Sequence, residues 1–235
     1  MVNLGTLRNA SSLKKVLLTV MVLGMATGVL GSGTFATFTA QTTNPNNTFV
    51  AGTLVLSNTK TGGTTCFSTG GGSTDTNSNS ACESLFNANV RKPGESAAQT
   101  LTVKNEGSLA ASALKLFSTA CGNANSAGES YFGTGLPCGK VQLYIQQYSD
   151  AGFTTPSACL YGGASGATCD FSDTTKTLSA FQGAYNSSTN GLTIGSGLAA
   201  GASVYVKVAV QLPSSADNSF QGRQASMDFN WFLSQ

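Results

Sequence analysis

The stretch SVYVKVAVQL, residues 203–212, alternates apolar and mixed side chains along its whole length. Every second residue from Val204 to Leu212 is a valine or a leucine. Since successive side chains of a strand point to opposite faces of a sheet, this period of two predicts a β-strand with one buried face. Residues 225–234, ASMDFNWFLS, repeat the pattern after a turn-rich connection, and we expect the two strands to form an antiparallel pair.

Weaker strand patterns occupy much of the chain before this stretch. They predict strands over 49–56, 85–90, 99–104, 110–117, 141–148 and 191–194, and a short helix is expected over 177–184. Turn signals and polar loops separate them, and residues 61–80 are almost entirely Gly, Ser, Thr, Asn and Asp. About eight short strands with such spacing are typical of a jelly roll or β-sandwich, so we predict an all-β fold of antiparallel strands with long polar loops.

Residues 1–36 have the three parts of a secretory signal peptide. The segment opens with basic and no acidic residues, continues with an apolar run at 16–30, and ends in small residues before a cut between Ala36 and Thr37. A retained membrane anchor is the alternative, but the run of about 15 residues is shorter than the roughly 20 that a spanning helix needs. We therefore expect a signal-peptide helix in the precursor, contact with the membrane only through the uncleaved leader, and a secreted product.

Charge excludes one class of partner. The leader takes three of the twelve Lys and Arg residues and none of the ten Asp and Glu residues, so residues 37–235 carry nine basic against ten acidic side chains. This balance lacks the basic footprint of a nucleic-acid-binding protein. Charged residues make up only 9% of the chain, which leaves little like-charge repulsion between copies and permits self-association.

Six cysteines follow the leader, an even number that favours disulfides in an exported chain. Zinc is the rival interpretation, but the chain has no histidine and no CxxC spacing. Fifteen pairings are possible for six cysteines. Sequential pairing is favoured because each bond then closes a short polar loop: Cys66 with Cys82, Cys121 with Cys138, and Cys159 with Cys169.

No catalytic motif is present in the sequence. The lack of histidine excludes a Ser-His-Asp triad and an HExxH zinc site. Residues 75–79, DTNSN, resemble the first half of a calcium loop, but Ser80 and Phe86 stand where its glycine and glutamate belong. The sequence leaves open a pair of carboxylates that could hydrolyse a glycosidic bond, since ten Asp and Glu residues are scattered along the chain. We expect no enzyme, no metal and no cofactor.

Four further stretches carry a resemblance to a known family. They are GTFATF at 33–38, NTFVAGTLVL at 47–56, KPGES with VKNEGSL between 92 and 109, and LP with NSFQG between 212 and 222. In this order they resemble the TasA/camelysin family of exported bacterial β-proteins, and the first resembles the cleavage site of leaders handled by a SipW-type signal peptidase. The cysteine-bearing loops depart from the family pattern.

The resemblance implies a jelly-roll domain, and some members of this family polymerise into extracellular fibres of a biofilm matrix. In such fibres the N-terminus exposed by cleavage adds as a strand to the sheet of the next subunit. Here it implies a leader at 1–36, an arm at 37–46 and a jelly-roll domain at 47–235. The donor strand would be formed by Thr37, Phe38, Thr39, Ala40, Gln41, Thr42 and Thr43, with Phe38 and Ala40 on one face. A disordered tail or pairing within the same domain are the alternatives.

The expected function is therefore a secreted structural subunit of an extracellular fibre or biofilm matrix. Its partners would be other copies in a head-to-tail homopolymer, and a signal peptidase during export. The alternative is a monomeric secreted β-domain that binds a glycan or a protein at a surface through its polar loops. A secreted hydrolase is a third hypothesis.

Overall fold

The computed structural model describes residues 12–21, 51–68, 82–86 and 92–235. The chain divides into two compact units, Met1–Phe49 and Val50–Gln235. In the first unit residues 12–21 are helical, with exposed side chains. Within the described ranges, no helix combines the length and the apolar character needed to cross a membrane.

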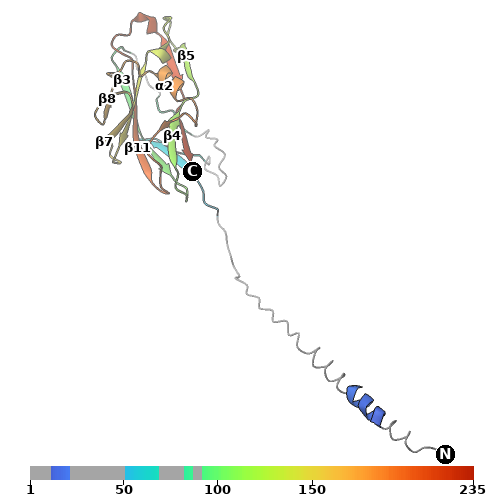
Figure 1. The fold of residues 1–235 in the computed structure, drawn as a ribbon. Helices are drawn as coiled ribbons and strands as arrows, with labels where there is room; N and C mark the ends of the chain where they lie inside the picture. Colours follow the sequence, from blue (N-terminus) through green and yellow to red (C-terminus); the bar gives the residue numbers. More distant parts are fainter. Residues whose placement is uncertain (1–11, 22–50, 69–81, 87–91) are drawn as a thin grey trace, which may run out of the picture. The chain divides into compact units, whose positions relative to one another are not determined.

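The second unit consists mainly of antiparallel strands (Figure 1). Its strands are β1 (Leu56–Lys60), β2 (Thr65–Phe67), β3 (Ser96–Asn105), β4 (Ala113–Phe117), β5 (Cys121–Asn125), β6 (Gln142–Tyr148), β7 (Pro156–Tyr161), β8 (Gly163–Ser165), β9 (Thr168–Asp170), β10 (Leu192–Thr193), β11 (Ser203–Gln211), β12 (Arg223–Met227) and β13 (Asn230–Ser234). The helix α2 (Leu178–Ala184) and the 3-10 turns η1 (Pro137–Gly139) and η2 (Asn218–Phe220) complete it. The predicted all-β class is confirmed.

One layer is a six-stranded sheet in the order β2-β1-β3-β11-β6-β7. The predicted strand at 203–212 appears as β11 in the middle of this sheet, between β3 and β6. Val206 and Val208 on β11 are fully buried, as the period of two indicated. The hairpin of β8 and β9 follows β7 in the chain, and the Cys159–Cys169 disulfide links β7 to β9.

The second layer is centred on a long two-stranded ribbon. One side of the ribbon is β4 followed by β5, and the other is β12 followed by β13; β4 pairs with β13 and β5 pairs with β12. Phe117 pairs with Asn230, and the next pair is Cys121 with Met227. Residues 118–120 thus oppose only two residues of the other strand, and this extra residue forms a β-bulge. β10 pairs with β4 on the side away from β13.

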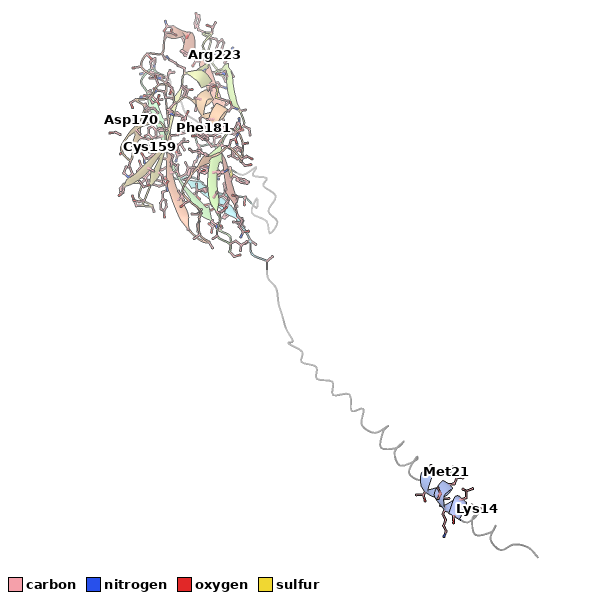
Figure 2. All side chains as sticks on the ribbon, in the orientation of Figure 1. Lys14, Met21, Cys159, Asp170, Phe181 and Arg223 are labelled. Carbon is pink, nitrogen blue, oxygen red and sulfur yellow. A yellow bond between two sulfur atoms is a disulfide. The ribbon has the colours of Figure 1, made fainter. Side chains whose placement is uncertain are left out.

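An apolar core fills the space between the two layers. The α2 helix begins after Thr177, whose Oγ1 accepts a hydrogen bond from the Ala180 amide at 3.2 Å, and buries Phe181 among the strands (Figure 2). The largest fully buried apolar side chains are Leu101, Val103, Leu114, Leu116, Leu143, Ile145, Phe181, Ile194, Val206 and Val208.

Two predictions about the C-terminal strands are wrong. β11 does not pair with the C-terminal segment, because the connection over 212–222 crosses from the six-stranded sheet to the ribbon instead of closing a hairpin. The predicted single strand at 225–234 is divided into β12 and β13, because the bulge interrupts its pairing with the neighbouring strand. A period of two identifies a buried face but not the partner of a strand.

Other predicted boundaries also differ. Of the predicted strand 49–56, residues 49–50 fall outside the described residues, and among 51–56 only Leu56 belongs to a strand. The preceding residues bond to a loop instead, since the Val55 carbonyl accepts a hydrogen bond from the Glu106 amide at 2.7 Å. Residues 85–86 of the predicted strand 85–90 lie outside any strand, and 87–90 fall outside the described residues. The predicted loop 61–80 contains β2, which pairs with β1. The edge strand β7 and the short polar strands β5, β8 and β9 were missed altogether.

Candidate functional site

The predicted cleavage residues and donor strand lie outside the described residues. This applies to Ala36 and to all of 37–43, so their roles stay predictions. The weak calcium-loop candidate at 75–80 lies outside them as well. The acceptor side of the hypothesis, however, concerns the domain itself.

All six cysteines form disulfides, in the sequential pairing that the loop lengths favoured. The bonds are Cys66–Cys82, Cys121–Cys138 and Cys159–Cys169. Each closes a loop of moderate length, for which restriction of the unfolded chain contributes about 3 kcal/mol in the chain-entropy account. Disulfides of this kind persist in oxidising compartments, in agreement with an extracellular environment.

The ribbon has a free edge along β12 and β13. Each of these strands pairs on one side only within the described residues, with β5 and with β4. The other strands with one unpaired side are less suited to accept a strand. The strands β2, β8, β9 and β10 are short, β5 is polar and mostly exposed, and β7 begins at Pro156 and pairs with β6 through two register shifts. β12 and β13 follow one another along the same side of the ribbon, with five strand residues each and only residues 228–229 between them.

Apolar side chains back this edge without being sealed from water. The inward residues of β12, β13 and the link between them pack against the core and remain partly exposed: Ala225, Met227, Phe229, Trp231 and Leu233. Phe232 points the other way and keeps 37% of its surface exposed. An added strand that carries apolar residues at alternate positions would cover both the unpaired backbone groups and these side chains.

The edge has a defined direction. Its last residue, Ser234, accepts a hydrogen bond from the Ser112 amide at 2.8 Å, close to a group of loops that we call the base (residues 51–53, 107–112 and 197–202). Its first residue, Arg223, lies at the opposite end of the domain, directly after residue 222 in the chain. We call this end the tip (residues 131–136 and 217–222). The strands β12 and β13 therefore run from tip to base (Figure 1).

Three of the aspartates accept hydrogen bonds within their own turns. The pKa of Asp170 is lowered by hydrogen bonds from the Ser172 hydroxyl and amide, and that of Asp173 by those of Thr175. The pKa of Asp217 is lowered in the same way by Ser219. In the described ranges, no group of three or more His, Cys, Asp or Glu side chains is arranged to hold a metal ion. The geometry gives these carboxylates a role in forming turns.

The outer face of the six-stranded sheet carries an aromatic cluster that the sequence did not indicate. The Phe153 ring makes edge contacts with Tyr148 and Tyr205, at centroid distances of 5.8 and 5.9 Å. Phe153 has a φ of 54°, an uncommon value for an aromatic residue. Asp150 holds this turn by accepting the Thr155 amide at 2.7 Å, and the DAGF sequence of the turn was the one available signal.

Comparison with known proteins identifies no relative. No protein-family model matches the chain, and a search of curated proteins finds no significant match. The function must therefore be argued from the residues and the geometry given above.

Proposed function

We propose that the chain is a secreted structural subunit of an extracellular fibre or biofilm matrix. A jelly-roll domain would accept, along the free edge of β12 and β13, the N-terminal strand of the next subunit. The residues 37–43 would supply that strand after cleavage between Ala36 and Thr37. Donor and acceptor would then be different surfaces of one molecule, and such contacts repeat into an open filament.

The observation that carries this proposal is the free edge with its partly exposed apolar backing. An edge with unpaired N–H and C=O groups is a template for another strand, and proteins that remain monomeric usually protect it. Among the described residues, β12 and β13 contain no proline and only one charged residue, Arg223, so two common protections of an edge strand are missing here. In 37–43, Phe38 and Ala40 would lie on the face that meets the core.

The two antiparallel layers, joined by a chain crossing at the tip, support a jelly roll. The disulfides support export, since an oxidising compartment maintains them. The low charge of the whole chain supports close packing of many copies.

Deletion of 37–41 is expected to leave folded monomers, because the donor strand loses Phe38 and Ala40 while the domain stays intact. The test expresses the full chain and its deletion variant, sequences the N-terminus of the exported material, and examines both by negative-stain microscopy and size-exclusion chromatography. Replacement of Thr39 and Thr42 with serine is the matched control and should still give filaments. Filaments from the deletion variant, or an exported chain that begins far from residue 37, would contradict the proposal.

The aromatic cluster favours a second function, binding of a glycan by the monomer. Tyr148, Phe153 and Tyr205 form a half-buried aromatic surface on a rigid sheet, and such surfaces combine apolar area with polar atoms. For this function, affinity electrophoresis in hydroxyethyl cellulose or xylan should retard the native protein but not the Tyr205→Ala variant. Tyr131→Ala, which removes an exposed tyrosine elsewhere, is the control. Equal mobility of all three proteins in both polymers would exclude these glycans.

A further inference from the structure

The tip exposes three large apolar side chains that the domain itself does not use. Tyr131 keeps 77% of its surface exposed, Leu136 keeps 61% and Phe132 keeps 44%. Apart from Phe232 on β13, the other large apolar side chains in the described part of the domain are buried or half-buried. A local concentration of such side chains on a small domain marks an interaction surface.

The loop that carries these side chains is firmly held. The Gly133 amide donates to the Gln221 carbonyl at 2.8 Å, and the Gly135 amide donates to the Ser219 carbonyl at 2.7 Å. The guanidinium of Arg223 also donates to the Gly135 carbonyl at 3.2 Å. The Cys121–Cys138 disulfide closes the segment at its two ends.

The backbone at Gly222 packs directly against the backbone at Tyr131 and further restrains this loop. Its φ is 63°, and a Cβ there would overlap the carbonyl oxygen of Tyr131. The backbone that carries the three apolar side chains is therefore held in one arrangement, so binding a partner would cost little backbone ordering entropy.

The direction of the acceptor edge indicates which surface meets the tip. Every strand pair in the described residues is antiparallel, and β12 and β13 run from tip to base. An antiparallel donor strand would run from base to tip and leave its acceptor in the direction of the tip. Residues 44–50 then lead to the donor's own domain, and seven residues span at most about 25 Å.

The donor's domain begins at its base, because the Thr53 carbonyl accepts the Leu109 amide there at 3.1 Å. The exposed residues of the base are small and uncharged, as in Ala51, Gly52, Ala110, Ala199 and Ala200. Aromatic and leucine side chains can pack on such a surface without burying a charge. The base therefore fits the chemistry of the tip.

We propose that Tyr131, Phe132 and Leu136 form the contact between domains in the filament, packing against the base of the neighbouring copy whose N-terminal strand the domain has accepted. This inference rests on the proposed strand exchange but goes beyond it, since strand exchange alone requires no contact between domains. A parallel donor strand would instead bring two bases together.

The test places a photo-crosslinking benzoylphenylalanine at position 131 of the full chain and irradiates the exported material before peptide mapping. Crosslinks from the tip to peptides of 51–53, 107–112 or 197–202 of another copy are expected. Filaments that form without such crosslinks, or with crosslinks only to other regions, would overturn the tip contact and leave strand exchange standing. If the unmodified protein forms no filaments, both proposals fail.

A second measurement uses the variant Tyr131→Ser/Phe132→Ser/Leu136→Ser, which keeps the glycines and the disulfide. We expect its thermal unfolding to be nearly unchanged and its critical concentration for assembly to rise by about tenfold or more. Glu129→Gln with Ser130→Ala, in the same loop, is the matched control and should assemble normally. An unchanged critical concentration in the folded triple variant would contradict the proposal.

Discussion

Replacement of Asn105 with leucine is expected to lower the free energy of unfolding by about 3 kcal/mol or more, since buried groups left without a partner cost about 1–3 kcal/mol each. Asn105 is fully buried at the base. Its Nδ2 donates to the Leu109 carbonyl at 2.8 Å and to the Leu198 carbonyl at 3.1 Å, and its Oδ1 accepts the Gly107 amide at 3.0 Å. Leucine has a similar size but makes none of these bonds. The Leu109 carbonyl and the Gly107 amide lose the bond to this side chain, whereas the Leu198 carbonyl still accepts the Ala111 amide at 2.9 Å.

Urea unfolding with intact disulfides measures the change through the midpoint at constant slope. Asn190 provides the control, because it is exposed and its amide reaches only Asn186 across a surface turn. Asn190→Leu should change stability by no more than about 0.5 kcal/mol. Similar losses for the two variants would show that the bonds of the Asn105 amide do not hold the base together.

Replacement of Phe181 with alanine is expected to cost about 3–5 kcal/mol, the range for removing a fully buried phenylalanine. The Phe181 ring lies 5.1 Å from the rings of both Tyr161 and Tyr185 and 6.2 Å from that of Phe229. It joins α2 to β7 and to the residue that precedes β13. The resulting cavity would therefore also loosen the support of the free edge.

Thermal unfolding and urea titration of Phe181→Ala should both show the loss. Phe232→Ala is the matched control, because Phe232 is on β13 but points outward with 37% of its surface exposed. We expect a change of less than about 1 kcal/mol for this variant. A loss as large as that of Phe181→Ala would contradict the assignment of Phe181 to the core.

The sequence predicted those parts of the fold that depend on local pattern. The alternating valines of β11 and the capped helix α2 were found because burial on one face imposes a period of 2 or 3.6 residues. The partners of β11 were not, because pairing between residues distant in the chain is decided by how the whole core packs. Strands such as β5 and β9 have few apolar residues, and the disulfides at Cys121 and Cys169 help to hold them in place.

The candidate site was predicted in a similarly uneven way. The apolar alternation of 225–233 indicated a buried face, and the structure places it along an edge that no periodicity could have identified. The exposed tip was missed because Tyr131, Phe132 and Leu136 follow no repeating pattern. The glycines at 133, 135 and 222 were the available signal, since each meets backbone or ring atoms at short range.

The extra residue of the bulge belongs to the inner strand, between β4 and β5, and not to the outer one. From Ala225 to Leu233 the alternation of inward and outward side chains consequently continues across the gap between β12 and β13, so a peptide paired along this edge would meet one consistent register. A slip of one position would turn Phe38 of such a peptide from the core to the solvent. The register of each added strand in a polymer would thus be selected by which of its side chains face the core, with no need for a specific side-chain pair.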